Sequence, residues 1–275
     1  MSAPLQPLVF AHGNSFPGGT YTQLHKSLRQ RGFAAKAVDR FGHDPKYPVT
    51  NNWPHLVQQL FDFAHREADK AGAPVWLVGH SLGGFLSVLC AARHPEVARG
   101  VVLIDSPMLG GWRASAVRML KQAQLVGALS PGAVSHKRRQ RWPDAAAALA
   151  HFEHKRAFAL WDRQCLLDYI EHGTMDAEGQ RVLRFDRDIE TAIYNTLPHN
   201  LEGVLRRHPL RCPVAFIGGT RSVEMRQVGM AMTEKLTHGR IMLLEGTHLL
   251  PMEKPLAVAA AVEASIRGME RNAPA

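Results

Sequence analysis

Short apolar runs alternate with amphipathic segments toward both ends of this chain. The runs span four or five residues and are bounded by glycine, proline or polar residues, a pattern typical of buried strands. Six strands are predicted, over residues 8–11, 34–38, 75–78, 101–104, 214–217 and 241–244. Apolar positions at helical spacing predict helices over residues 20–30, 54–70, 82–93, 222–237 and 255–269. This alternation predicts an α/β protein with a mostly parallel sheet flanked by helices on both faces.

The alternation stops between Pro107 and His208. Helical patterns such as residues 144–154 and 186–196 fill this stretch, and no strand is needed there. The chain has 275 residues, of which 45% are hydrophobic and 21% charged, enough for one large core and an insertion. We therefore expect a core of residues 1–106 and 210–275 and a helical insertion of residues 107–209.

A G-x-S-x-G motif stands at the end of the third predicted strand. Residues 75–84 read V-W-L-V-G-H-S-L-G-G and lead directly into a predicted helix. This context predicts a nucleophile elbow, a tight turn that holds the Ser81 hydroxyl clear of the sheet. Gly79 and Gly83 suit the turn because side chains there would collide with it.

Two further strands end in reactive groups. The first is followed by His12-Gly13-Asn14-Ser15, and the last by Glu245-Gly246-Thr247-His248. Ligands of open α/β sheets bind at the carboxyl ends of parallel strands, so groups placed there can converge although they are distant in sequence.

On these residues the chain resembles the α/β-hydrolase superfamily. The matching pieces are the H-G loop at residues 12–13, D-x-x-G-H at 39–43, G-H-S-L-G-G at 79–84 and G-T-H at 246–248. The resemblance covers about residues 8–106 and 211–270. It implies that the six predicted strands form an α/β-hydrolase fold without the two-stranded hairpin with which the superfamily usually begins. It also implies that the insertion forms a helical cap that covers the site as a lid and supplies the substrate pocket.

A serine hydroxyl is a weak nucleophile at neutral pH, so it needs a base and a group that orients the base. His248 is the expected base. The superfamily usually places the acid after the fifth strand, but residues 218–224 read G-G-T-R-S-V-E and contain no aspartate. Asp105, at the end of the fourth strand, is the preferred acid and Glu224 the alternative. Both keep the chain order serine, acid, histidine.

Two backbone donors are expected to hold the oxyanion. One is the N–H of Leu82, at the start of a helix whose dipole favours negative charge. The other is the N–H of Asn14 or Ser15. The resemblance favours Asn14, whose side chain is a candidate for a further donor.

The expected activity is that of a serine hydrolase, esterase-like, acting on a small-molecule carboxylic ester or related acyl substrate without cofactor or metal. Acyl transfer, hydrolysis of a carbon–carbon bond, lactone opening and perhydrolysis use the same constellation and stay open. The missing aspartate motivates another alternative, a non-catalytic scaffold that binds a ligand or protein.

The formal net charge is +9, but the basic residues are scattered apart from the basic segment, residues 136–141. A solvated face is the preferred interpretation of this segment, and attraction of acidic substrates or an anionic partner is the alternative. No nucleic-acid module accompanies it, so nucleic acid is not an expected partner. The three cysteines lack C-x-x-C spacing and are expected to serve packing.

The amino terminus has neither a basic start nor a long apolar run, and no segment has the length needed to span a bilayer. A cytoplasmic location is therefore expected. The oligomeric state stays open between monomer and homodimer.

Overall fold

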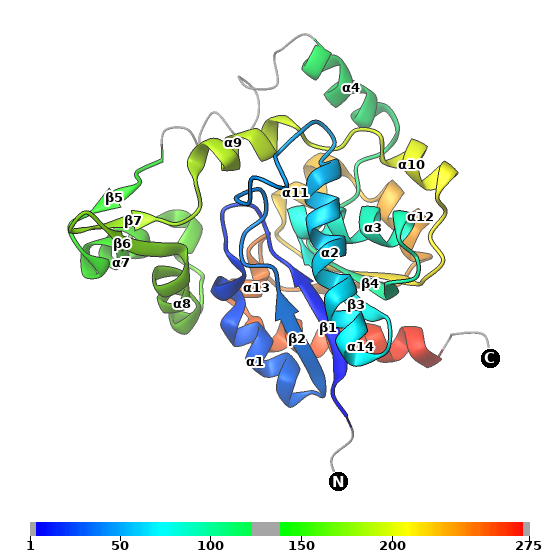
Figure 1. The fold of residues 1–275 in the computed structure, drawn as a ribbon, viewed down its shortest axis with the longest axis horizontal. Coiled ribbons are helices and arrows are strands. Elements are labelled where there is room, and N and C mark those ends of the chain that lie inside the picture. Colours follow the sequence, from blue (N-terminus) through cyan, green and yellow to red (C-terminus); the bar gives the residue numbers. More distant parts are fainter. Residues whose placement is uncertain (1–3, 123–137, 272–275) are drawn as a thin grey trace.

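The computed structural model describes residues 4–122 and 138–271. Its body is a sheet of six parallel strands in the order β2-β1-β3-β4-β8-β9 (Figure 1). The strands are β1 (Gln6–Ala11), β2 (Phe33–Ala37), β3 (Val75–His80), β4 (Ala98–Ile104), β8 (Val214–Gly219) and β9 (Ile241–Leu244). The six predicted strands are confirmed and differ only at their ends.

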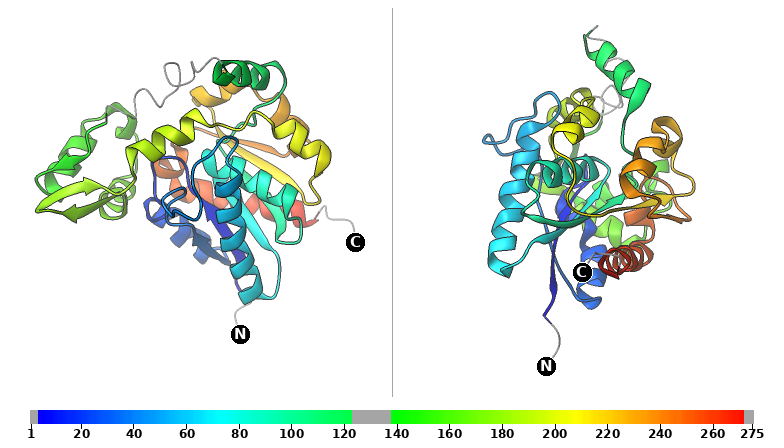
Figure 2. Two further views of the ribbon diagram at one scale, coloured as in Figure 1. Left: turned by 45° about the horizontal axis from the view of Figure 1, so that its top comes forward. Right: turned by 90° about the vertical axis from the view of Figure 1, so that its right-hand side faces the viewer.

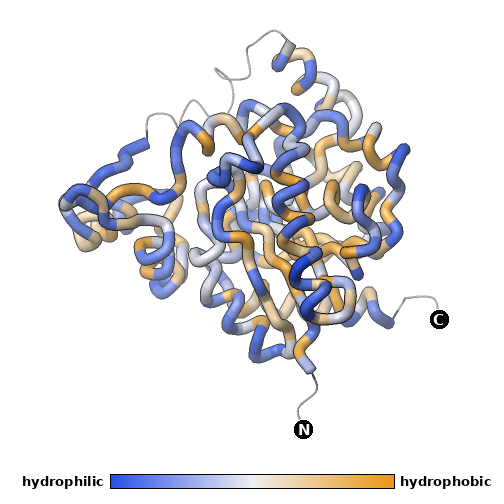
Figure 3. The backbone as a smooth tube through the Cα atoms, viewed as in Figure 1, coloured by the Kyte–Doolittle hydropathy of each residue, from blue (hydrophilic) through white to orange (hydrophobic). Residues whose placement is uncertain are grey.

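Alternate strand residues serve two different cores, one on each face of the sheet. Val9 and Ala11 face α2 (Pro54–Ala71) and α3 (Leu82–Arg93), whereas Leu8 and Phe10 face the opposite helices. Those opposite helices are α1 (Thr22–Gln30), which follows the 3₁₀ turn η1 (Gly18–Tyr21), and α14 (Pro255–Arg271). Figure 3 shows the resulting concentration of apolar residues along the central strands. The α/β class and the two helical layers are as predicted.

One predicted helix is interrupted. Residues 222–237 form α11 (Val223–Val228) and α12 (Ala231–Thr237) in place of one continuous helix. Gly229, with φ +77° and ψ 167°, adopts a conformation that residues with a Cβ rarely adopt, and α11 ends there. The continuous apolar spacing concealed this break because both short helices turn apolar residues toward the same core.

The insertion between β4 and β8 contains strands as well as helices. Its helices are α4 (Gly111–Gln122), α7 (Ala145–Glu153), η2 (Arg156–Phe158), α8 (Arg163–Gly173), α9 (Arg187–Asn195) and α10 (Leu201–Arg207). A three-stranded antiparallel sheet adds β5 (Arg141–Trp142), β7 (Gln180–Leu183) and β6 (Thr174–Ala177). The expectation that this stretch has no strand was wrong. Glu178 and Gly179, with φ of 52° and 71°, form a two-residue hairpin turn, and such turns favour antiparallel pairing.

A side lobe, made of β5, α7, η2, α8, β6 and β7, lies to one side of the sheet, and α9 runs from it toward the core (Figures 1 and 2). The D-x-x-G-H motif ties the insertion to the core. The Arg184 guanidinium pairs with Asp39 at 2.7 Å, and Asp186 N donates to His43 Nε2 at 2.9 Å. The other end of the insertion packs on the core through α10, which contacts α3. The boundaries 107 and 209 stay a prediction.

Candidate active site

Ser81 occupies a strained turn between β3 and α3. Its φ of 53° and ψ of −117° lie in a region that L residues rarely adopt. A Cβ at Gly79 would come within 2.2 Å of the Gly83 carbonyl oxygen, and one at Gly83 within 1.9 Å of the Ala11 oxygen. The two glycines therefore permit the close approach of β3, α3 and β1 that holds the serine in this turn.

His248 lies in the loop after β9 and contacts both Ser81 and Asp105. Its Nε2 is 3.0 Å from Ser81 Oγ, and its Nδ1 is 2.8 Å from Asp105 Oδ1. A carboxylate can only accept, so Nδ1 carries a hydrogen and Nε2 is left to accept the serine proton. The structure thus brings together the three residues that the sequence analysis selected.

Asp105 follows β4 directly and is fully buried, with a positive φ of 39°. Its Oδ2 accepts a hydrogen bond from Gly219 N at 2.6 Å, and its Oδ1 accepts one from Ser222 Oγ at 2.6 Å. Both donors belong to the loop after β8, where the superfamily usually has its acid. Sequence reasoning missed Ser222; its one signal was its place as the N-cap of α11.

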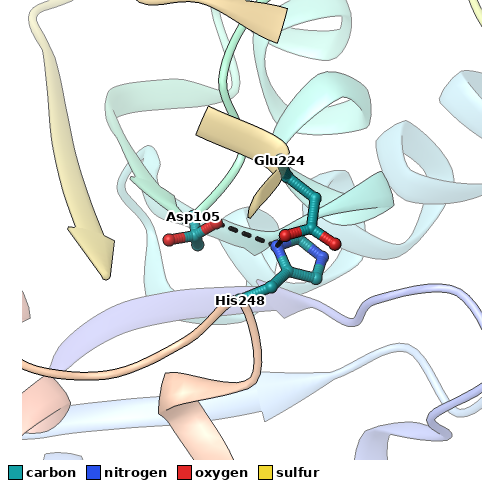
Figure 4. Close-up of side chains that lie close together, drawn as sticks. All are labelled: Asp105, Glu224 and His248. Atoms are coloured by element: carbon teal, nitrogen blue, oxygen red, sulfur yellow. Dashed lines mark hydrogen bonds and ion pairs between the residues drawn. The ribbon is translucent and has the colours of Figure 1, made fainter. Parts of the chain in front are cut away.

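Glu224 lies near the same imidazole nitrogen (Figure 4). Its Oε2 is 3.7 Å from His248 Nδ1, beyond hydrogen-bond distance, and 42% of its side chain is exposed. The direct hydrogen bond to His248 therefore belongs to Asp105. Glu224 acts on the imidazole through its charge.

The two carboxylates change the protonation of His248. Burial favours the neutral imidazole, but the hydrogen bond that His248 donates to Asp105 and the charges of Glu224 and Asp105 outweigh it, so the pKa of His248 is raised from its ordinary value of 6.5. Ligand atoms of these three residues lie within 4.8 Å of one another, as in a metal site. Asp105, however, already accepts hydrogen bonds on both oxygens, which favours proton transfer over metal ligation.

A buried chain of hydrogen bonds links the two sides of the site. Gly13 N donates to Tyr21 OH at 3.0 Å, Tyr21 OH donates to His80 Nδ1 at 2.7 Å, and His80 Nε2 donates to the His248 carbonyl at 2.9 Å. Burial and the neighbouring His248 lower the pKa of His80 to about 3, so it stays neutral. The motif histidine His12 likewise binds backbone groups, at Gly13 O and Phe41 N.

Of the expected oxyanion residues, Asn14 and Leu82 line one cavity together with Ser81. Leu82 is the first residue of α3, where the helix supplies no carbonyl partner for its N–H. The side chains of Asn14 and Ser15 point elsewhere: Asn14 Nδ2 donates to Glu190 O at 3.0 Å, and Ser15 Oγ donates to the Glu190 carboxylate. Their backbone groups remain the candidates.

Two cavities meet at Ser81 and His248. The small pocket, of about 120 Å³, is mainly apolar, and the wide cavity, of about 1110 Å³, opens between the core and the side lobe. Side chains that line the small pocket include Trp53, Phe85, Leu109, Ile193 and Leu197. A substrate bound across Ser81 can therefore place one part in each cavity.

Comparison with known proteins identifies the family of this chain. A family model described as alpha/beta hydrolase family matches residues 8–261. The chain is 28% identical to a monoglyceride lipase of Rattus norvegicus over 129 residues, which are 45% of this chain and only 43% of that lipase. It is 23% identical to a probable alcohol acetyltransferase of Cyberlindnera fabianii over 275 residues, covering 93% of this chain and 70% of that protein.

Among solved structures, E-2-(acetamidomethylene)succinate hydrolase is similar, with a TM-score of 0.73 and 23% sequence identity. The match covers 97% of this chain and 92% of that one, so the fold is shared along nearly the whole length. None of the described helices combines the length and apolarity needed to cross a membrane.

Proposed function

This chain belongs to the alpha/beta hydrolase family, and from that premise we propose that it is a serine hydrolase that cleaves a carboxylic ester or a related acyl bond. One observation carries the proposal: His248 contacts Ser81 Oγ through Nε2 and Asp105 through Nδ1. This is the arrangement that nucleophilic acyl transfer requires. The similarity to a lipase supports the same reaction class.

In the first half-reaction, Ser81 Oγ forms a bond to the acyl carbon while its proton moves to His248 Nε2. Asp105 keeps the imidazole in the required tautomer and stabilises its positive charge. The tetrahedral intermediate then collapses, the bond to the leaving group breaks, and the proton passes from Nε2 to that group.

In the second half-reaction, His248 takes a proton from water, and the water oxygen attacks the acyl-enzyme. Collapse of the second intermediate releases the carboxylic acid and returns the proton to Ser81. The backbone N–H groups of Leu82 and Asn14 are the proposed donors to both oxyanions, and loss of one such donor typically costs about 10²- to 10³-fold in rate.

Covalent labelling tests the proposal. A fluorophosphonate probe is expected to add once to the wild type and not to Ser81→Ala, as read by intact mass. Turnover of short and medium p-nitrophenyl esters, run in parallel, is expected to disappear in the same variant. A Ser81→Ala protein that retains turnover would contradict the mechanism, and an unlabelled, inactive wild type would favour a non-catalytic scaffold.

Acyl transfer to an alcohol is a second candidate, supported by the acetyltransferase relative that matches most of the chain. An alcohol would then replace water in the second half-reaction. The test is to add ethanol to an ester assay and measure whether ethyl ester forms in excess of free acid.

A further inference from the structure

The wide cavity beside Ser81 has an excess of positive charge. Five cationic side chains line it, against three carboxylates. The cations are those of Arg138, Arg139, Lys155, Arg156 and Arg221, and the carboxylates are those of Glu190, Glu224 and Glu253. An anionic group in this cavity would therefore meet a favourable field.

The carboxylates leave little negative charge to attract a cation. Glu190 is buried and pairs with Arg138 at 3.1 Å. Glu253 accepts hydrogen bonds from Thr247, one of them from Thr247 N at 3.0 Å. Glu224 faces the imidazole of His248.

Three of the cations also have partners. Arg138 is bound to Glu190, and Arg221 Nη2 lies 3.8 Å from Glu245 Oε1. Arg139 Nε donates to the Arg141 carbonyl at 2.9 Å, and the Arg139 guanidinium lies over the Trp142 ring. None of these groups is fully available to a ligand.

Lys155 and Arg156 differ from the other three. Both are exposed, Lys155 directly before η2 and Arg156 as its first residue, and neither has an ion-pair partner among the described residues. The charge of Lys155 acts on a neighbouring side chain, because burial and then the charges of Lys155 and Arg139 lower the pKa of His151, which lines the same cavity.

Apart from these charges, much of the cavity wall is apolar. Phe16, Phe152, Phe158 and Leu160 contribute to it, and 52% of Leu160 is exposed. The small pocket on the other side of Ser81 has room for a short acyl chain only. The larger part of a substrate therefore belongs in the wide cavity.

We propose that the substrate carries an anionic group, a carboxylate or a phosphate, on its leaving-group portion, and that Lys155 and Arg156 bind this anion while a short acyl chain occupies the small pocket. The inference rests on the proposed serine hydrolase function. The cations of this proposed site lie outside the basic segment, residues 136–141. Arg138 and Arg141 of that segment are paired with Glu190 and Glu178, whereas Lys155 and Arg156 follow α7. His136 and Lys137 lie outside the described residues.

Matched thioesters test the charge preference. The S-butyryl esters of 3-mercaptopropionate and of 3-mercaptopropanamide differ by one carboxylate in place of one amide. We expect kcat/KM, measured by thiol release at low salt, to be about five- to tenfold higher for the carboxylate, since two exposed charge pairs contribute modestly. The advantage should shrink as salt is added. S-Butyryl 4′-phosphopantetheine compared with S-butyryl pantetheine tests a phosphate in the same way.

The variant Lys155→Gln with Arg156→Gln should bring both ratios close to one. Arg206→Gln with Lys235→Gln removes the same net charge from exposed positions that do not line the cavity, and should leave the ratios unchanged. If the wild-type protein hydrolyses both thioesters of a pair with equal kcat/KM, the anion site is overturned and the hydrolase function stands.

Calorimetric binding to Ser81→Ala separates the two proposals if no thioester is turned over. Binding of the carboxylate thioester in preference to the amide, lost in Lys155→Gln with Arg156→Gln, would support the anion site while the hydrolase function fails. Equal binding of the two would overturn the anion site as well.

Discussion

Ser222 donates its hydroxyl hydrogen to Asp105 Oδ1 at 2.6 Å, across a separation of 117 residues. The loop after β8 therefore supplies hydrogen-bond donors to an acid that comes from β4, the neighbouring strand. A carboxylate at this point of the loop would face Asp105 as a like charge. Because Asp105 already supplies the carboxylate, residues 218–224 need hydrogen-bond donors there and not a second aspartate.

Asp105→Asn is expected to lower kcat about 10³- to 10⁴-fold, because an amide favours the wrong imidazole tautomer and cannot stabilise the imidazolium. Glu224→Gln is expected to change kcat by less than about tenfold, since its carboxylate is half exposed and 3.7 Å away. Steady-state kinetics with a p-nitrophenyl ester compares the two, with circular dichroism to confirm folding. A larger loss in Glu224→Gln would make Glu224 the acid.

Ser222→Ala is expected to lower kcat about tenfold, because Asp105 loses one of its charge-assisted hydrogen bonds. The same change removes the N-cap of α11, where Ser222 Oγ accepts from Met225 N, and should cost about 1 kcal/mol of unfolding free energy. Kinetics and urea denaturation measure the two effects separately. Thr220→Ala, at an exposed position of the same loop, is the control and should behave as wild type.

Glu224→Gln is also expected to shift the acid limb of the pH–rate profile. Catalysis needs neutral His248, so kcat/KM falls as the pH drops through the pKa of this residue, which lies above 6.5. Removal of the Glu224 charge destabilises the imidazolium, lowers that pKa and extends activity to lower pH. An acid limb unchanged between wild type and variant would show that the Glu224 charge does not reach the imidazole.

The sequence predicted the sheet and the meeting of Ser81, His248 and Asp105 for one physical reason. Each of these residues follows a short apolar run, and parallel strands bring their carboxyl ends to one edge. The sequence favoured Asp105 and kept Glu224 as the alternative, because the distinction depends on a difference of about one ångström in the distance of each carboxylate from His248 Nδ1.

The insertion was harder to predict. Its hairpin depends on the two positive-φ residues Glu178 and Gly179, and Glu-Gly is a weaker turn signal than Asn-Gly or Asp-Gly. The role of Glu190 beside the site was not predicted. Its partner Ser15 lies 175 residues away, and local sequence patterns do not indicate a contact at that separation.

Tyr21→Phe is expected to lower kcat about tenfold with little change in KM. The hydroxyl of Tyr21 accepts from Gly13 N and donates to His80, so its loss leaves a buried N–H unpaired, at a cost of about 1–3 kcal/mol. That change loosens both the loop before Asn14 and the support of the His248 backbone. Tyr47→Phe, which loses a hydrogen bond to Asp62 far from Ser81, is the control; equal kcat losses in both variants would refute a positioning role for Tyr21.

Glu190→Gln is expected to destabilise the protein far more than Glu178→Gln, although each removes one carboxylate paired with an arginine. Glu190 is buried, binds Arg138 at 3.1 Å and accepts from Ser15, so it joins α9 to the loop after β1 and to the segment that precedes β5. Loss of its charge leaves the partly buried guanidinium of Arg138 beside Tyr169 without a counter-charge, which costs about 3 kcal/mol, the low end of the range for buried pairs. The pair of Arg141 with Glu178 is exposed, and its loss should cost less than about 1 kcal/mol. Urea denaturation of both variants measures the difference, and comparable losses would mean that the contacts of Glu190 with Arg138 and Ser15 stabilise the protein no more than the exposed pair does.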